Sequence, residues 1–235
     1  MCSDVKSLPA ERSLSVVIPA LNAGEGLTAT LESLREGAGA FDMDVLVVDG
    51  GSDDDTVAVA EANGTRVVTS PRGRGTQMVA GAEEAQRDWL LFLHADTVLA
   101  TGWARELAAF MESGDARAAY FRFRLDDDAP GARRIEWLVA WRCRVLGLPY
   151  GDQGLALSRR LYQETEGYPD QPLMEDVHLV RRLGRRRLAG LQSAATTSAE
   201  RYRSGGYWRR PARNLFCLLL YLFGASPLFV ARVYR

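Results

Sequence analysis

An alternation of short apolar runs with helical patterns over the first 112 residues is the feature that most constrains this fold. Strand-like runs rich in branched apolar residues occupy 14–18, 45–48, 67–68 and 89–93. Helical spacing or helix-capping residues follow at 24–36, 54–62, 75–87 and 101–112. Strand–helix units in this order build a sheet through right-handed crossovers. The sequence therefore predicts an α/β fold with a mostly parallel central sheet flanked by helices.

The second half of the chain is less regular. Residues 118–125 alternate enough to predict a strand, and 126–131 predict a turn. An amphipathic helix is expected at 133–145, another strand at 154–158 and a helix at 173–183. We divide the chain into a tail at 1–13, one domain at 14–200 and a C-terminal segment at 201–235. Within the domain, 14–113 is the expected nucleotide-binding half and 114–200 the expected acceptor-binding half.

Charge and cysteine content narrow the function. A net charge of −1 over 235 residues predicts no general attraction to nucleic acid. Cys2, Cys143 and Cys217 are scattered, which indicates neither a disulfide framework nor a zinc site. The first twelve residues lack the apolar core of a secretory signal. These features favour a cytoplasmic protein.

Acidic residues follow two of the predicted strands and open a later helix. Asp49 comes after 45–48, Asp96 follows 89–95, and Glu175-Asp176 begin the helical pattern at 173–183. Carboxylates at the carboxyl ends of parallel strands face the crevice in which open α/β sheets bind ligands. We expect a nucleotide-type ligand, a metal ion and a general base, and hence an enzyme.

The turns after the first three strands are candidate nucleotide contacts. Pro19, Ala20 and Asn22 follow the first strand, and Asp49 precedes two glycines that allow close approach of a ligand. Asp49 is suited to a base or ribose hydroxyl. An ordinary turn and a capping role for Asp49 explain the same residues.

Arginines after the third strand provide a further candidate contact. Arg72 and Arg74 alternate with glycines just before a helix, which suits a phosphate or a base. A solvated surface loop is the alternative.

His94-Ala95-Asp96 ends the fourth predicted strand and is the candidate metal site. In an extended segment His94 and Asp96 point to the same side. Mg²⁺ or Mn²⁺ would take the Asp96 carboxylate together with diphosphate oxygens and water. A capping aspartate beside a buried histidine is the other explanation.

Three later segments have both a chemical and a structural explanation. Glu175 or Asp176 is suited to deprotonate a hydroxyl, although acidic residues also stabilise a helix N-terminus. Asp152 and Gln153 line a predicted acceptor pocket or form a hairpin turn. Arg201 and Arg203 belong to a mobile lid over a diphosphate or to a plain linker.

Four segments together resemble the family 2 glycosyltransferases of the GT-A fold. They are residues 15–22, 47–54, 91–96 and the pair Glu175-Asp176, in the order typical of that family. The similarity is closest to a bacterial subgroup with His-Ala-Asp in place of the usual Asp-x-Asp and with a Gly-Asp-Gln-Gly segment.

The resemblance implies inverting transfer of a sugar from a UDP- or GDP-linked donor to a hydroxyl acceptor. It assigns the base contact to Asp49, the nucleotide contact to Arg74, the divalent ion to Asp96 and the role of catalytic base to Asp176. His94 and Ala95 line the same donor site by motif, with His94 in the place of a usual aspartate. Gly50 replaces a second aspartate that many members carry.

The C-terminal segment contains the uncharged run 215–231, interrupted by Gly224 and Pro227 and preceded by arginines and aromatic residues. The run is at the lower length limit for a transmembrane helix. Basic and aromatic residues beside it favour a helix at the inner face of the cell membrane. The alternative is a helix buried on the domain or in a dimer interface. Membrane contact would suit a lipid-linked acceptor.

Two other functions are compatible with the same sequence pattern. A nucleotidyltransferase would use the same layout, but it usually carries a basic Gly-rich loop after its first strand, and residues 19–26 contain no base. A catalytically silent, membrane-attached nucleotide-sugar-binding module is the other alternative.

Overall fold

A single mixed sheet of eight strands organises the computed structural model of the chain, which describes residues 12–114 and 116–234. The strands are β1 (Ser13–Ala20), β2 (Asp42–Asp49), β3 (Arg66–Thr69), β4 (Trp89–Phe92), β5 (Thr97–Leu99), β6 (Ala118–Leu125), β7 (Leu155–Ser158) and β8 (Leu188–Thr197). Their order across the sheet is β3-β2-β1-β4-β7-β6-β8-β5. Residues 1–11 of the predicted tail lie outside the described residues.

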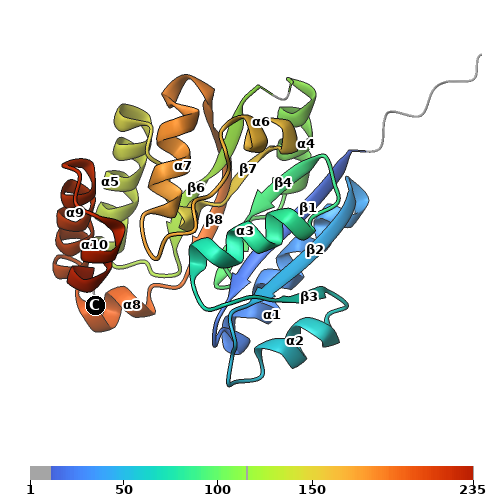
Figure 1. Cartoon of the computed structure of the whole chain (residues 1–235), viewed down its shortest axis with the longest axis horizontal. Coiled ribbons are helices and arrows are strands. Elements are labelled where there is room, and N and C mark those ends of the chain that lie inside the picture. The colour runs from blue at the N-terminus through green and yellow to red at the C-terminus, as the bar shows by residue number, and fades with distance from the viewer. Residues whose placement is uncertain (1–11, 115, 235) are drawn as a thin grey trace, which may run out of the picture.

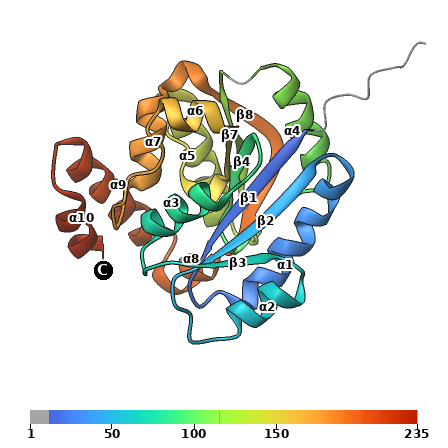
Figure 2. The same cartoon turned by 45° about the vertical axis from the view of Figure 1, so that its right-hand side comes forward.

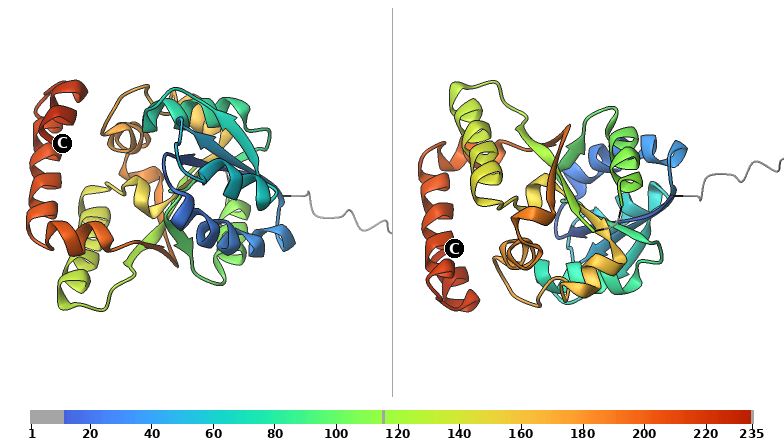
Figure 3. Two further views of the ribbon diagram at one scale, coloured as in Figure 1. Left: turned by 90° about the horizontal axis from the view of Figure 1, so that it is seen from below. Right: turned by 90° about the horizontal axis from the view of Figure 1, so that it is seen from above.

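Helices occupy both faces of this sheet (Figures 1 and 3). They are α1 (Gly24–Leu34), α2 (Thr56–Ala62), α3 (Arg74–Glu84), α4 (Trp103–Glu112), α5 (Pro130–Leu146), α6 (Arg159–Glu164), α7 (Glu175–Leu183), α8 (Glu200–Gly205), α9 (Arg209–Leu222) and α10 (Pro227–Tyr234). Short 3₁₀ turns occur at Arg35–Gly39, Gly151–Gln153 and Arg185–Arg187.

The first half of the chain forms the predicted parallel sheet. β1 pairs in parallel with β2 and β4, and β2 pairs in parallel with β3. The chain order reverses direction between β1 and β4, which places the ligand crevice of an open α/β sheet at their carboxyl ends. Strand β1 extends to Ala20 rather than ending before Pro19. The pairing of β1 with β4 ends at Val17. The missing N–H of Pro19 therefore costs no hydrogen bond between these two strands.

The alternation of apolar residues divides the core between the two faces of the sheet. Val16 and Ile18 pack with the side chains of α1 and α4, whereas Val17 packs with those of α3 and α7. Successive strand residues point to opposite faces, which accounts for this division. Gly81 lets α3 lie close to the sheet, because a Cβ there would meet Val17 and Val48 at 2.3 and 2.8 Å.

The second half adds the antiparallel part of the sheet. β7 runs antiparallel to both β4 and β6, while β8 runs parallel to β6 and antiparallel to β5. Strands β5 and β8 were not predicted. The small residues of β8 have little intrinsic preference for strands, and pairing on both edges holds them in place.

The C-terminal residues form three helices at one end of the molecule. α8, α9 and α10 lie beside α5 and α7, on the side away from β3 (Figures 1 and 2). The predicted apolar run at 215–231 is divided between α9 and α10, and Gly224 in the connection has φ +92°. None of the helices in the described residues is long and apolar enough to cross a bilayer.

Candidate functional site

The loops that follow β1 and β2 are joined to each other. The Oδ1 atom of Asn22 accepts a hydrogen bond from the backbone N–H of Asp53 at 2.9 Å, and the N–H of Asn22 donates to Oγ of Ser52 at 2.9 Å. Asn22 adopts a left-handed backbone with φ 49°, which asparagine tolerates better than most residues. The two loops therefore form one rim of the crevice.

Asp49 is buried at the end of β2 and holds its own turn. Its carboxylate accepts hydrogen bonds from the backbone N–H groups of Gly51, at 3.0 Å, and Ser52, at 3.2 Å. These bonds fix the carboxylate beside the loop from β1. Ala20 pairs with Asp49 in the sheet register, and Pro19 with Val48.

Gln77 is a buried residue of α3 that the sequence did not single out. Its side-chain amide donates to the carbonyls of Ala20 and Val48, both at 2.7 Å. These carbonyls lie at the carboxyl ends of β1 and β2. Gln77 therefore ties the floor of the crevice to the helix that carries Arg74.

Arg74 forms an ion pair with Glu175, which is only 1% exposed. Around this pair, Oγ1 of Thr76 donates to Asp170 at 2.6 Å. Gly75 is required beside them, because a Cβ there would meet the carbonyl oxygen of Gln171 at 2.5 Å. The start of α3 is thus fastened to the loop that leads into α7.

A left-handed residue introduces the acidic pair. Met174 has φ 66° immediately before α7, a conformation that is costly for a residue other than glycine and tends to occur at functional sites. Burial raises the pKa of Glu175, and the charge of Arg74 opposes this effect. Asp176 is 9% exposed and accepts a hydrogen bond from the backbone N–H of Gly151 at 2.9 Å.

Asp152 lies among these charges. Burial raises the pKa of Asp152 to about 6; Arg142 opposes the shift, whereas the charges of Asp176 and Asp96 add to it. Its Oδ1 atom is buried and makes no hydrogen bond to the described residues. Asp152 thus marks the point at which the β4 end, the Gly151–Gln153 turn and the start of α7 converge. The sequence predicted Asp152 as an acceptor-site residue but gave no sign of this electrostatic setting.

The His94-Ala95-Asp96 segment differs from its predicted geometry. Strand β4 ends at Phe92, and the N–H of Thr97 donates to the carbonyl of His94 at 3.2 Å. The expectation of an extended segment is therefore wrong, because the chain turns here to enter β5. The His94 ring instead contacts Gly151, where a Cβ would lie 2.7 Å from Nε2. The hydroxyl of Thr197 lies 3.4 Å from Oδ1 of Asp96.

Gln153 is buried and used in internal contacts. Its Oε1 accepts from Arg142 at 3.2 Å and its Nε2 donates to the carbonyl of Phe121 at 3.1 Å. The Arg142 guanidinium lies 3.4 Å from the centre of the Tyr150 ring. Arg142 is a second residue that the sequence did not single out, and its charge lies close enough to act on Asp152.

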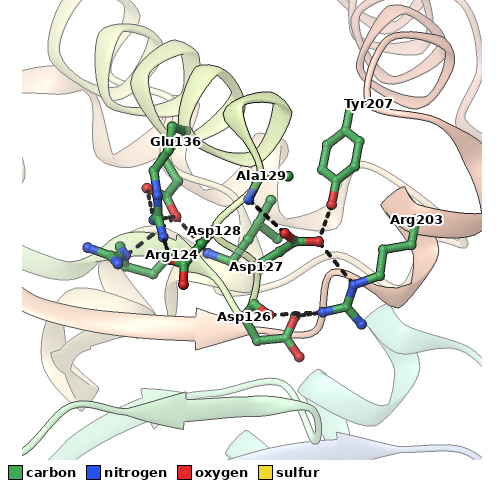
Figure 4. Close-up of polar contacts among 10 residues, drawn as sticks. Arg124, Asp126, Asp127, Asp128, Ala129, Glu136, Arg203 and Tyr207 are labelled. Carbon is green, nitrogen blue, oxygen red and sulfur yellow. Dashed lines mark hydrogen bonds and ion pairs between the residues drawn. The ribbon is translucent and has the colours of Figure 1, made fainter.

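The remaining predicted arginines have different surroundings. Arg72 is exposed in the loop between β3 and α3. Arg203 donates to the carboxylates of Asp126 and Asp127, both at 3.0 Å, and Tyr207 also donates to Asp127 (Figure 4). The predicted lid segment is thus tied to the turn after β6 in this structure. Arg201 lies in α8, and its side chain lies outside the description.

The C-terminal segment also borders the carboxylates. Burial raises the pKa of Tyr202 to about 12, and the charge of Asp152 adds to this shift. The Arg210 guanidinium lies 5.3 Å from the centre of the Tyr202 ring and reaches the Tyr234 hydroxyl at 3.5 Å. A narrow gap beside Asp176, too small to hold a water molecule, is lined by Pro149, Tyr150, Gly151, Gly154, Leu155, Tyr168 and Val180.

A divalent cation fits this site only with help from a ligand. Within the described ranges, no group of three or more His, Cys, Asp or Glu side chains is placed to hold a metal ion. Burial is the main cause of the raised pKa of Asp152, and the negative charge of Asp96 adds a smaller contribution in the same direction. A hard cation on Asp96 would offset this negative charge, with oxygens of a bound ligand and water completing its coordination.

Known structures share this fold. The chain aligns with glucosyl-3-phosphoglycerate synthase from Mycobacterium tuberculosis in complex with Mg²⁺ and UDP, with a TM-score of 0.64, 22% identity, and coverage of 89% of this chain and 79% of that one. The same enzyme with Mn²⁺ and UDP-glucose gives a TM-score of 0.62 at 22% identity, covering 89% and 78% of the two chains. This similarity confirms the predicted GT-A fold.

Sequence comparison gives the family. An uncharacterised glycosyltransferase of Mycobacterium tuberculosis is 36% identical over 103 residues, and one of Mycobacterium bovis matches to the same extent. The alignment covers 43% of this chain and 45% of each relative, so the chain spans less than half the length of the curated relatives it matches. The family model described as "Glycosyl transferase family 2" matches residues 15–189. The chain therefore belongs to glycosyltransferase family 2.

Proposed function

We propose that the protein is an inverting glycosyltransferase that moves a sugar from a nucleotide-diphosphate sugar to a hydroxyl acceptor. The observation that carries this proposal is the convergence of the segments that hold Asp96, Asp152, Asp176 and Arg74. They are joined by the contacts of Gly151 with His94 and Asp176 and by the ion pair of Arg74 with Glu175. These residues come from four separate segments, and the charges of the other three act on the pKa of Asp152. The crevice thus combines groups suited to a cation, a phosphate and a proton.

Asp176 is the proposed general base. Its hydrogen bond from Gly151 fixes the carboxylate in the first turn of α7. In the proposed step Asp176 takes the proton of the acceptor hydroxyl. The acceptor oxygen forms a bond to the anomeric carbon as the bond from that carbon to the diphosphate oxygen breaks. The nucleoside diphosphate leaves with the bonding electron pair, and the configuration at the anomeric carbon inverts.

Asp96 would hold the divalent ion, Mg²⁺ or Mn²⁺, with His94 as a proposed neighbour. When bound, the ion supplies charge stabilisation to the departing diphosphate. Arg74 is the side chain that we propose to stabilise the negative charge of the same diphosphate. Asp49 and Asn22, on the rim formed by the first two loops, are the proposed contacts to the base and ribose, with Pro19, Ala20, Arg72 and Ala95 beside them.

Glu175 has a different proposed role from Asp176. Its contact with Arg74 and its 1% exposure separate it from an incoming acceptor. A buried carboxylate paired with a guanidinium orients that guanidinium. We therefore assign Glu175 to positioning Arg74 and leave proton removal to Asp176.

Donor and acceptor are proposed at the level of chemical class. The structural neighbours include two complexes of glucosyl-3-phosphoglycerate synthase, one with UDP-glucose and one with phosphoglyceric acid. UDP-glucose is the first donor to test here, with GDP-linked sugars next. His94, in the place of a usual aspartate, supports assignment to the His-Ala-Asp subgroup. We propose an acceptor presented at the cytoplasmic face of the membrane, because exposed apolar side chains gather on the helices next to the crevice.

The direct test is a donor-hydrolysis and transfer screen of the full chain with UDP-, GDP- and dTDP-sugars, each with Mg²⁺, Mn²⁺ or chelator. Metal-dependent release of a nucleoside diphosphate from at least one donor is expected. Release of pyrophosphate from a sugar phosphate and a nucleoside triphosphate would instead show a nucleotidyltransferase.

A further inference from the structure

Exposed apolar side chains of this protein are concentrated at one end of the molecule. Among the described residues, only two of the large apolar side chains that are exposed, Leu21 and Val98, lie elsewhere. The others are on α5 or between residues 208 and 229, and Trp208 and Phe223 reach 70% and 87% exposure. They are Trp137, Leu138, Trp141, Val145, Leu146, Trp208, Leu215, Phe216, Leu219, Leu222, Phe223, Leu228 and Phe229. We call this set the apolar end.

Helix α9 is apolar on two opposite faces. Cys217 and Leu218 are buried against the core that contains α7, and Tyr221 contacts His178 at 3.0 Å. Residues 215, 216, 219, 222 and 223 repeat at helical spacing on the other face and are exposed. The inner face fixes the helix on the domain. The outer face therefore has no partner among the described residues. We expect another molecule to cover it.

A set of contacts holds the C-terminal segment beside α5. Tyr207 packs on the first turn of α5, where a Cβ on Gly131 would meet its ring at 2.7 Å. Arg203 and Tyr207 bind the carboxylate of Asp127 in the turn before α5 (Figure 4). Arg134 of α5 lies over the Trp208 ring at 5.1 Å. The apolar faces of α5 and α9 therefore belong to one fixed assembly of helices (Figures 1 and 3).

The C-terminal segment of the sequence is strongly basic. Residues 201–235 contain seven arginines and no acidic residue. The chain as a whole has a net charge of −1, so residues 1–200 carry −8. Arginine and tryptophan beside exposed leucine and phenylalanine are typical of helices in the headgroup region of an anionic bilayer. A second copy is a poorer partner, because a two-fold interface would place this arginine-rich segment near its own copy.

We infer that the apolar end, formed jointly by α5, α9 and α10, docks the enzyme on an anionic lipid bilayer without crossing it. This surface rests on the proposed membrane-side acceptor and adds α5, which ends 55 residues before the C-terminal segment begins. Docking there would place the crevice near the lipid surface, because Tyr221 of α9 contacts His178 of α7, the helix that begins with Glu175 and Asp176.

Vesicle flotation of the full chain tests this surface. Wild-type protein, W137S/W141S on α5 and F216S/F223S in the C-terminal segment are mixed with phosphatidylcholine vesicles, with or without phosphatidylglycerol. The control, V98S, removes an exposed apolar side chain from β5, outside the apolar end. We expect binding to anionic vesicles that salt weakens, with V98S like wild type. Each double variant should partition at least about tenfold more weakly, because it lacks two exposed apolar side chains that would insert into the bilayer.

Three outcomes would overturn the inference. They are no flotation with either lipid, flotation that both double variants retain in full, and a dimer by sedimentation that the double variants dissociate while no form binds vesicles. Donor hydrolysis without vesicles is measured on every variant. A variant that hydrolyses the donor but does not float supports docking by this surface and shows that the chemistry is intact. A wild-type protein that floats but hydrolyses no donor refutes the proposed function and not the docking surface. Circular dichroism confirms folding.

Discussion

The backbone N–H of Gly151 donates a 2.9 Å hydrogen bond to Oδ2 of Asp176, across 25 positions of sequence. This bond joins the Gly151–Gln153 turn, which follows α5, to the first turn of α7. Because the same turn carries Asp152 and packs on His94, it brings the carboxyl end of β4 and the acidic pair to one place. The candidate base is held by a backbone group that substitution of side chains leaves in place.

Asp176→Asn tests the base directly. The amide oxygen can replace the carboxylate oxygen that accepts from Gly151, and only the contact of the second oxygen with the N–H of Val177 is lost. The fold and donor binding should therefore be retained, while turnover should fall on the order of 10²–10⁴-fold. Steady-state transfer rates and calorimetric titration of the donor measure the two effects. Asp128→Asn, a change at a fully exposed carboxylate, is the matched control. Undiminished turnover in Asp176→Asn would remove this residue from catalysis.

Asp152→Asn tests the buried electrostatics through stability. The pKa of Asp152 is raised from 3.8 to about 6 in the folded protein. Between these pH values the unfolded chain has lost a proton that the native state keeps, so the free energy of unfolding falls as pH rises through this window. Above it, the ionised carboxylate costs up to about 3 kcal/mol, since each pKa unit corresponds to about 1.4 kcal/mol.

The asparagine variant lacks this cost. Its Tm should therefore exceed that of the wild type at pH 8, and the two should converge near pH 4. Differential scanning calorimetry at both values provides the comparison. A Tm advantage that is equal at pH 4 and pH 8 would show that Asp152 titrates normally in the native state. A more stable but less active variant would indicate that function retains a destabilising carboxylate.

Much of the nucleotide-binding half could be predicted from the sequence because its signals are local. The apolar runs before Asp49 and Asp96 are strands with both faces buried, and such runs are recognisable without tertiary information. Asp152 and Asp176, two of the acidic residues that the sequence singles out, lie on segments that the hydrogen bond from Gly151 joins. Strand β8 could not be predicted, because its alanines and glycine have little preference for strands and become part of one by pairing with β6 and β5.

The finer parts of the site depend on contacts between distant segments. In the sequence, Gln77 is an ordinary residue of a predicted helix. Only the positions of β1 and β2 in the fold show that its side-chain amide donates to the carbonyls at their ends. Arg142 likewise faces Tyr150 and Gln153 from the long helix α5. The turn at His94-Ala95-Asp96 depends on pairing of β5 with β8, which no local pattern indicates.

The pair formed by Arg74 and Glu175 predicts a non-additive effect on stability. Arg74→Ala leaves a carboxylate that is 1% exposed without its counter-charge, and such a loss costs about 3–5 kcal/mol for a buried pair. Because the arginine side chain is itself 38% exposed, we expect a smaller loss of about 1–3 kcal/mol. The double variant Arg74→Ala/Glu175→Gln should be more stable than Arg74→Ala alone.

Urea unfolding of the wild type, both single variants and the double variant completes this cycle. Strictly additive changes in the free energy of unfolding would show that the two side chains do not interact. Donor affinity should fall in every variant that lacks Arg74, including the more stable double variant.

Gln77→Leu removes the tie between α3 and the ends of β1 and β2. Two buried carbonyls each lose a donor, which should lower the free energy of unfolding by about 1–3 kcal/mol and weaken donor binding. Chemical denaturation measures the first effect and calorimetry the second. Gln192→Leu, at an exposed position of β8, should change neither, and an equal loss in both variants would contradict a special role for Gln77.

The central claim is that one crevice binds a nucleotide sugar through a cation held by Asp96. Calorimetric titration of the full chain with UDP-glucose, with Mn²⁺ and with chelator, on the wild type and Asp96→Ala, tests it most directly. We expect Mn²⁺ to strengthen donor binding to the wild type, and we expect Asp96→Ala to lose this gain. Identical titrations of the two proteins, or no dependence on the cation in either, would contradict it.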